Sequence, residues 1–212
     1  MNPKTEHQLW DGPSGPVEVS IDRPTEGLYG LAVIAHPHPL FGGTKDNKVV
    51  QTIARAFLQL GYITLRFNFR GVGQTAGVHD HGNGEKSDMV YLTQKAHQEL
   101  LPENLKNAPI ALAGFSFGAF VCSHAAIELN QMNLPVGKMA LVGTATSRFQ
   151  VAPVPSNTLV IHGEVDDTVP LQSVLDWARP QDLPVVVMPG VEHFFHGKLP
   201  TLKETLVRYY PS

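Results

Sequence analysis

The sequence has few of the features that stabilise secreted proteins or anchor proteins in membranes. Cys122 is the only cysteine in 212 residues, so no intramolecular disulfide can form, and a cytoplasmic location is expected. No apolar run is long enough to span a bilayer, and the first residues lack the basic and apolar regions of a signal peptide. We therefore expect no membrane partner.

The chain also lacks an excess of positive charge. It has 16 Lys and Arg against 19 Asp and Glu, a formal net charge of -3, and no run of basic residues. This balance argues against a nucleic-acid partner, because phosphate binding needs clustered Lys and Arg. No change in composition divides the chain, so residues 1–212 are expected to form a single domain.

Apolar strand-like stretches alternate with helical patterns along most of the sequence. After a pair of short strands within residues 7–22, the expected strands cover residues 29–35, 62–67, 110–113, 139–142, 159–161 and 185–188. The expected helices cover residues 47–58, 85–101, 119–127 and 199–210, with a further helix beginning near Pro170. This alternation predicts an α/β fold with a doubly wound, mainly parallel sheet of about seven to eight strands.

The connection at residues 143–157 is too irregular to form a helical lid. It contains Pro153 and Pro155 and has no helical periodicity. We therefore expect a site that is open and shallow.

Residues 17–21 alternate between apolar and polar side chains, as a half-exposed edge strand does. Such an edge can pair two copies of a chain or stay solvated. The expected assembly is therefore a monomer or a homodimer.

A Gly-x-Ser-x-Gly motif at residues 114–118 is the most informative feature of the sequence. It follows the apolar stretch at 110–113 and precedes a helical pattern, which is the context of a nucleophile elbow. The glycines permit a sharp strand-to-helix turn, because a Cβ at either position would collide with nearby backbone. Ser116 is therefore the predicted nucleophile, with the N–H groups of a helix N-terminus behind it.

An elbow serine needs an acid and a histidine later in the chain, in that order. Asp166 is the predicted acid because it follows the strand at 159–161, and Asp167 is the second choice. The alternative role for such acids is to cap the helix that begins near Pro170. That role fits Asp167 or Thr168 better.

The histidine is sought after the strand at 185–188. His193 lies closer to the end of that strand than His196 does, so His193 is the predicted general base. A solvated side chain is expected for His196.

An oxyanion hole should accompany these three side chains. One predicted donor is the backbone N–H of Phe117, the residue after the nucleophile. The second should come from the loop after the strand at 29–35. The prolines of this loop have no N–H, which leaves His38 or Leu40, with His38 preferred because it is nearer the strand.

Several phenylalanines fall on loops near the predicted site. Phe41, Phe149, Phe194 and Phe195 are candidates for an apolar substrate surface, with Phe41, Phe149 and Phe194 preferred. Packing beneath the loops is an equally good interpretation of their pattern.

Two histidine pairs raise the alternative of a metal site. His36 and His38 have no cysteine or acid of suitable spacing beside them, and His79 and His81 lie in a glycine-rich loop that makes a poor rigid cage. No metal is therefore expected.

The glycine-rich loop at residues 70–84 also lacks the lysine and the spacing of a phosphate-binding loop. Arg70 is instead expected to anchor this loop by pairing with Asp88 or Glu85.

Five segments together resemble the α/β-hydrolases, and closely the small lidless bacterial subgroup related to dienelactone hydrolases and to certain serine peptidases. They are residues 36–43, 68–73, 114–118, 162–166 and 193–197. The resemblance implies Ser116 as nucleophile, Asp166 as acid and His193 as base. The elbow carries serine where dienelactone hydrolase itself has cysteine, so the resemblance does not imply the dienelactone substrate.

These features predict a serine hydrolase that cleaves small carboxylic esters through an acyl-enzyme on Ser116, without a cofactor. A peptidase, amidase or acyltransferase with the same triad is the first alternative. A non-catalytic α/β-hydrolase scaffold that binds a small ligand or a partner is the second. The scaffold is disfavoured because all three triad positions hold competent residues.

Overall fold

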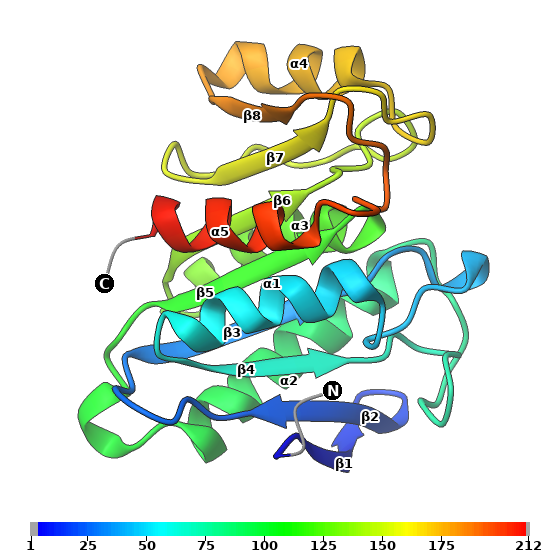
Figure 1. Ribbon diagram of the computed structural model, residues 1–212. Coiled ribbons are helices and arrows are strands. Elements are labelled where there is room, and N and C mark those ends of the chain that lie inside the picture. The colour runs from blue at the N-terminus through cyan, green and yellow to red at the C-terminus, as the bar shows by residue number, and fades with distance from the viewer. Residues whose placement is uncertain (1–3, 211–212) are drawn as a thin grey trace.

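An eight-stranded sheet runs through the chain in the order β1-β2-β4-β3-β5-β6-β7-β8 (Figure 1). A computed structural model describes residues 4–210. The strands are β1 (Glu6–Gly12), β2 (Gly15–Asp22), β3 (Gly30–Ala35), β4 (Tyr62–Phe67), β5 (Ile110–Phe115), β6 (Val136–Val142), β7 (Leu159–Gly163) and β8 (Val185–Met188). β2 is antiparallel to both of its neighbours, and every other pairing is parallel.

Helices cover both faces of this sheet. They are α1 (Lys48–Gln59), α2 (Asn83–Leu100), α3 (Phe117–Gln131), α4 (Leu171–Ala178) and α5 (Leu199–Tyr209), with short 3-10 turns η1 (Pro39–Phe41), η2 (Glu103–Leu105) and η3 (Arg179–Gln181). α1 and α5 lie on the face nearer the viewer in Figure 1, and α2 and α3 lie behind the sheet. This arrangement confirms the predicted doubly wound α/β fold.

The central strands are buried on both faces, and this is why they read as continuous apolar runs. All six residues of β5 are buried. Successive side chains point to opposite faces. Leu112 therefore packs in the core beneath α2 and α3, whereas Ala111 and Ala113 pack in the core beneath α1 and α5.

No lid covers the sheet in the part of the chain that the structure describes. Residues 143–157 form neither helix nor strand, as their prolines predicted. Among the helices of residues 4–210, none has the length and apolar character that a membrane crossing requires.

The prediction that residues 17–21 form a sheet edge is wrong. They lie in β2, between β1 and β4, and Val19 is paired with Gln8 on one side and with Phe67 on the other. The tight hairpin between β1 and β2 places β1 outside, so β1 is the edge strand. The alternation at 17–21 therefore offers no free edge to a second copy.

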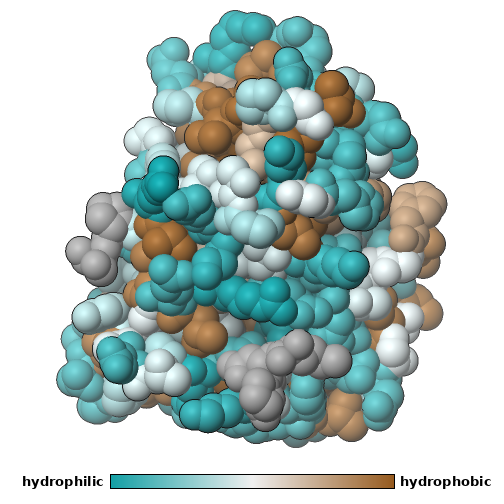
Figure 2. All heavy atoms as spheres, viewed as in Figure 1, coloured by the Kyte–Doolittle hydropathy of each residue, from teal (hydrophilic) through white to brown (hydrophobic). Residues whose placement is uncertain are grey.

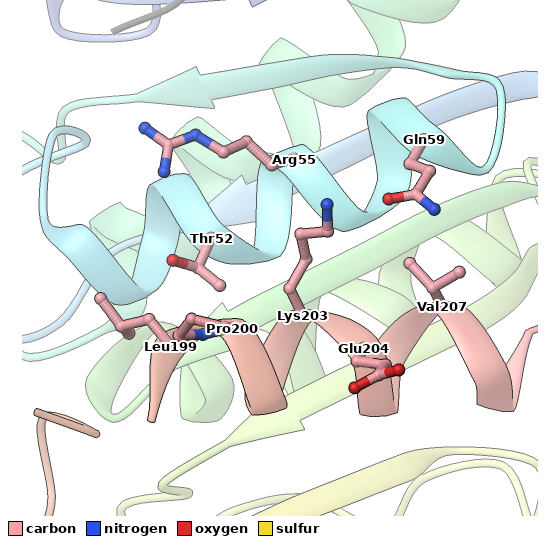
Figure 3. Close-up of a pocket in the computed structure, with 8 residues that line it drawn as sticks. All are labelled: Thr52, Arg55, Gln59, Leu199, Pro200, Lys203, Glu204 and Val207. Atoms are coloured by element: carbon pink, nitrogen blue, oxygen red, sulfur yellow. The ribbon is translucent and has the colours of Figure 1, made fainter. Parts of the chain in front are cut away.

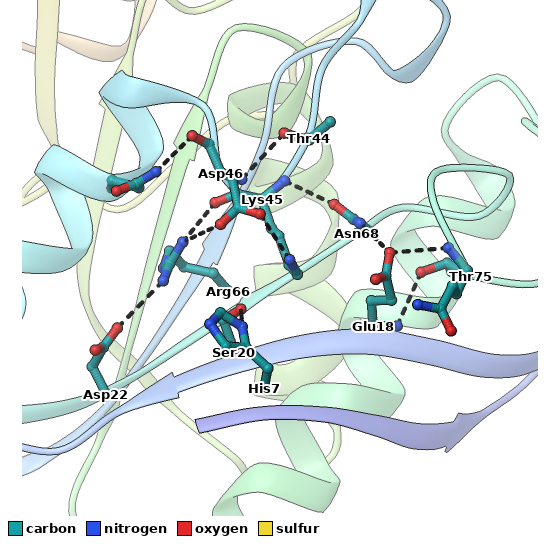
Figure 4. A network of polar contacts seen from close by, with 12 residues as sticks. His7, Glu18, Ser20, Asp22, Thr44, Lys45, Asp46, Arg66, Asn68 and Thr75 are labelled. Atoms are coloured by element: carbon teal, nitrogen blue, oxygen red, sulfur yellow. Dashed lines mark hydrogen bonds and ion pairs between the residues drawn. The ribbon is translucent and has the colours of Figure 1, made fainter. Parts of the chain in front are cut away.

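A buried polar network fastens the segment before α1 to the sheet (Figure 4). The Arg66 guanidinium on β4 donates a hydrogen bond to the Lys45 carbonyl at 2.9 Å and lies 3.4 Å from an Asp22 carboxylate oxygen. The Lys45 N–H donates to the Asn68 side chain at 2.8 Å, and Asn68 donates to Glu18 at 2.7 Å. The hydrogen bonds to the Lys45 carbonyl and N–H fix the segment that enters α1. The buried charge of Arg66 is tolerated because it is paired.

Arg70 anchors the glycine-rich loop as predicted. Two of its guanidinium nitrogens each lie 2.8 Å from the Asp88 carboxylate, which gives a bidentate pair with α2. Glu85 has a different role, because its carboxylate lies 2.8 Å from His79 and accepts the N–H groups of Asp80 and Gly82.

His36 joins the loop after β3 to the loop after β4. Its Nε2 accepts the Phe69 N–H at 2.9 Å, so the ring proton is on Nδ1, which donates to the Pro37 carbonyl at 2.6 Å. Burial lowers the pKa of His36 to about 3, although the Pro37 carbonyl favours the charged form. His36 is therefore neutral at physiological pH, and neither ring nitrogen is left for a metal.

The buried His36 should make the fold sensitive to acid. Its pKa rises from about 3 in the folded chain to an ordinary 6.5 on unfolding, so the unfolded chain binds the extra proton between these pH values. The free energy of unfolding should therefore fall as pH drops below about 6.5, by about 1.4 kcal/mol per pH unit from this group. In urea denaturation at a series of pH values, His36→Gln should show a smaller fall in the free energy of unfolding below pH 6.5 than the wild type does.

The exposed His196 gives a matched control for this measurement. His196→Gln should keep the wild-type slope. Equal slopes for wild type and His36→Gln below pH 6 would contradict the assignment of the acid sensitivity to His36.

Candidate active site

Ser116 occupies a sharp turn between β5 and α3. Its backbone has φ of 56° and ψ of -116°, a conformation that non-glycine residues adopt only where the surroundings enforce it. A Cβ at Gly114 would lie 2.4 Å from the Gly118 backbone, and one at Gly118 would lie 2.4 Å from the Ala35 carbonyl oxygen. Both glycines of the motif are therefore required by close backbone contacts.

Three side chains from the carboxyl ends of β5, β7 and β8 meet in a hydrogen-bonded line. The Ser116 Oγ lies 3.1 Å from His193 Nε2, and His193 Nδ1 lies 2.6 Å from an Asp166 carboxylate oxygen. All three residues are buried. The structure thus brings together the three side chains that the sequence predicted as nucleophile, base and acid.

Asp166, and not Asp167, faces the imidazole. Its second carboxylate oxygen accepts the N–H groups of Thr168 at 2.9 Å and Val169 at 2.7 Å. Burial alone would raise the pKa of Asp166, but the hydrogen bonds from His193 and the Val169 N–H outweigh it and lower the pKa. Asp166 is therefore a carboxylate at neutral pH and accepts the His193 Nδ1–H.

The alternative role, a helix cap at Asp167 or Thr168, is not observed. The residue before α4 is Pro170, and no side chain caps this helix. Asp167 is exposed to solvent. The N–H groups of Thr168 and Val169 donate instead to the buried Asp166 carboxylate.

Aromatic rings fix the position of the His193 imidazole. The ring of Phe115 lies 4.9 Å away and that of Phe194 lies 5.1 Å away, measured between centroids. His196 is exposed and pairs with Glu192 at 3.0 Å, in agreement with the solvated side chain that was expected.

The first turn of α3 lies against the loop that follows β3, because Gly118 contacts the carbonyl groups of Ala35 and His36. Within residues 4–210, nothing accepts a hydrogen bond from the N–H of Phe117 or of His38. The Leu40 N–H, in contrast, donates to the His38 ring at 3.3 Å. Of the two alternatives after β3, the structure favours His38 over Leu40 as a free donor.

Comparisons with known proteins agree with this geometry. No protein-family model matches the chain. An α/β serine hydrolase without a lid from Xanthomonas campestris is 34% identical, with 99% of this chain and 94% of that chain covered and a TM-score of 0.88. An α/β serine hydrolase homologue from Coxiella burnetii is 38% identical, with 97% of both chains covered and a TM-score of 0.83.

The chain belongs to the lidless α/β serine hydrolases. An uncharacterized protein of Rickettsia prowazekii is also 30% identical over 210 residues, which cover 94% of this chain and 86% of that protein. The resemblance inferred from the sequence motifs is therefore confirmed at the level of the family.

A cavity of about 420 Å³ opens beside Ser116 in this serine hydrolase. Its described lining consists of Pro37, His38, Phe41, Gly42, Gly43, Asn47, Ser116, Arg148, Thr168, His193 and Phe194. Phe41 is 76% exposed and Phe194 is 43% exposed, so two of the predicted phenylalanines present apolar surface at the opening.

Phe149 is not among the described residues that line this cavity. Its ring stacks on Phe120 with centroids 4.9 Å apart and packs edge-on against Phe117 at 5.1 Å. Phe195 is fully buried in the core. The packing interpretation therefore holds for the rings of Phe149 and Phe195. The residues before them, Arg148 and Phe194, are the ones that line the cavity.

Asn47, Arg148 and Thr168 also line this cavity, and none of them was predicted from the sequence to be a site residue. Asn47 caps α1 by accepting the Val49 N–H at 2.8 Å, and its place at the helix start was the available signal. Thr168 and Arg148 lie in loops without periodicity. Nothing in the local pattern shows which way such side chains point.

A larger hollow of about 580 Å³ lies elsewhere, in the groove between α1 and α5. Figure 3 shows that its lining comes from these two helices, with Lys203 of α5 directed toward α1. The surface on this face is mostly hydrophilic with scattered apolar residues (Figure 2). None of the three side chains of the hydrogen-bonded line takes part in this groove.

No group of three or more potential metal ligands occurs in residues 4–210. His79 lies 2.8 Å from Glu85, and its ring packs 5.1 Å from that of His81. The polar partner of His79 is therefore the Glu85 carboxylate, which also accepts the N–H groups of Asp80 and Gly82.

The close contact at Gly118 should be essential to the geometry of the elbow. Gly118→Ala should lower the free energy of unfolding by about 2–3 kcal/mol, because the added methyl overlaps the Ala35 carbonyl. It should also slow the labelling of Ser116 by a fluorophosphonate probe. Urea denaturation and mass spectrometry of the labelled protein measure the two effects.

Gly190→Ala serves as the control, because a Cβ there meets nothing within 4 Å and only the positive φ of 66° opposes it. That variant should lose about 1 kcal/mol and keep the wild-type labelling rate. Equal labelling rates in both variants would show that the Gly118 contact does not position Ser116.

Proposed function

We propose that this chain is a carboxylesterase that forms an acyl-enzyme on Ser116. The observation that carries the proposal is the line from the Ser116 Oγ through His193 to Asp166, with separations of 3.1 Å and 2.6 Å. A serine hydroxyl is a weak nucleophile unless an adjacent base accepts its proton. The imidazole is at the distance and in the tautomer that this transfer needs.

In the first half-reaction, His193 Nε2 takes the Ser116 proton while the Oγ attacks the ester carbonyl carbon. The carbonyl π electrons move onto oxygen, and the resulting anion is placed to accept hydrogen bonds from the Phe117 and His38 N–H groups. The negative charge of Asp166 stabilises the imidazolium. Collapse of the tetrahedral intermediate breaks the ester C–O bond, and His193 gives its proton to the departing alcohol.

In the second half-reaction, water replaces the alcohol. His193 removes a proton from the water as its oxygen attacks the acyl carbon, and the same donors stabilise the second anion. Breaking the bond to Ser116 Oγ releases the carboxylic acid, and the proton returns to the serine. Preorganised oxyanion donors typically contribute about 10²–10³ in rate each.

Esters are favoured over amides by the shape of the cavity. An open hollow of about 420 Å³ with two exposed phenylalanines at its mouth offers apolar contact. Such a surface suits the apolar group of a small ester, whereas an extended peptide would also need partners for its backbone N–H and C=O groups.

Removal of the nucleophile should abolish turnover. Ser116→Ala should lower kcat for a short-chain p-nitrophenyl ester by about 10⁴–10⁶, because no other group can form the acyl-enzyme. Stopped assays of p-nitrophenol release measure this, and matched aminoacyl amides test the amidase alternative. Turnover equal to that of the wild type in Ser116→Ala would exclude the proposed mechanism.

The two neighbouring aspartates provide a matched pair. Asp166→Asn should lower kcat by about 10³–10⁴, because the amide no longer holds the imidazole in the required tautomer. Asp167→Asn should leave kcat within about twofold of the wild type, since this side chain is exposed and turned away. A large loss in Asp167→Asn with little loss in Asp166→Asn would reverse the assignment.

A further inference from the structure

Arg148 lines the cavity beside Ser116, although ester cleavage by itself requires no cation there. Among the described residues that line this cavity, Arg148 is the only Lys or Arg, and no Asp or Glu joins it. Asp166 is separated from the cavity by the His193 ring to which it is hydrogen bonded. The guanidinium charge is therefore not neutralised by an acidic side chain of the cavity wall.

Arg148 also differs from every other arginine of the chain. The others are held by partners: Arg23 by Glu6, Arg55 by Gln51, Arg66 by Asp22 and Asp46, Arg70 by Asp88, Arg179 by Asp176 and Arg208 by Glu204. Within residues 4–210, the Arg148 guanidinium has neither an ion pair nor a hydrogen bond. Its donors are available to a ligand.

The backbone of Arg148 is fixed even though its side chain is exposed. Phe149, the next residue, is clamped between the rings of Phe117 and Phe120. The N–H groups of Arg148 and Phe149 both donate to the Ala145 carbonyl, at 3.3 Å and 3.1 Å. A cation on a fixed stem loses less conformational freedom when it binds a ligand than one on a mobile loop.

The charge of Arg148 is felt inside the cavity. The pKa of His38 is lowered, first by burial and then by His79. The Glu85 carboxylate opposes this shift, and Arg148 adds a smaller lowering. The positive charge of Arg148 therefore acts on a residue of the cavity wall.

We propose that the substrates of this serine hydrolase are small esters that carry a second, anionic group, which Arg148 binds. The proposal rests on ester cleavage at Ser116 as described above. A carboxylate is the group whose two oxygens best match the planar guanidinium fork. Half-esters of short dicarboxylic acids have this form. Their apolar linker would lie against the exposed rings of Phe41 and Phe194.

A matched series of substrates tests the anion site. The 4-nitrophenyl half-ester of adipic acid is compared with its neutral primary amide, with the corresponding amine and with a phosphate-bearing analogue. Wild type should favour the half-ester over the amide by about 10-fold or more in kcat/KM, mainly through KM, because the charge is remote from the reacting bond. The amine should be the poorest substrate, and salt should weaken the preference.

Variants at Arg148 should move this preference. Arg148→Gln should bring the ratio of half-ester to amide close to one, Arg148→Lys should restore part of it, and Arg148→Glu should favour the amine. Arg179→Gln removes an exposed cation beyond the cavity and should keep the wild-type ratio. The phosphate analogue decides whether any anionic group serves or whether the site selects a carboxylate.

The outcomes separate this proposal from the function on which it rests. Equal kcat/KM for half-ester and amide in wild type, or an unchanged ratio in Arg148→Gln, would overturn the anion site while turnover of both esters upheld the esterase. Wild type that cleaves none of the esters and does not label with a fluorophosphonate at Ser116 would overturn both.

Discussion

The contact between the start of α3 and the carbonyl groups of Ala35 and His36 is the constraint on which the site depends. It is possible only because Gly118 has no side chain. It brings the N-terminus of α3 beside the loop after β3, and residues of this loop line the same cavity as Ser116. The unusual backbone angles of Ser116 are a consequence of this contact, and the buried strands on either side resist its relaxation.

The loops that form the cavity are held from outside by polar contacts buried in the fold. His36 links the loop after β3 to the loop after β4, and Arg66 and Asn68 fasten the segment that leads into α1. These groups make no contact with the cavity themselves. Their side chains hold the cavity walls through hydrogen bonds to backbone groups of the loops. Such bonds fix loop positions more tightly than apolar packing alone, because each bond has a preferred direction.

The sequence predicted those parts of the structure that local chemistry determines. The glycines of the elbow and the apolar strands each have a short-range physical cause, and the elbow motif requires an acid and then a histidine later in the chain. The choice between Asp166 and Asp167 was less certain from the sequence, because it depends on which carboxylate the loop N–H groups of Thr168 and Val169 enclose. The edge position of β1 and the packing of Phe149 on Phe120 depend on contacts between distant segments. Local periodicity in the sequence does not report such contacts.

The irregular connection at residues 143–157 has a kinetic consequence. Because no lid element occurs in the described residues 4–210, an acyl group attached to Ser116 in the proposed mechanism would face bulk solvent throughout its lifetime. Water would then always have access to the acyl group and would outnumber any dilute alcohol. Hydrolysis to the free acid would therefore be favoured over transfer of the acyl group to an alcohol. Turnover would not wait for a gate to open, and selection among substrates would have to occur at first encounter, on the exposed walls of the cavity.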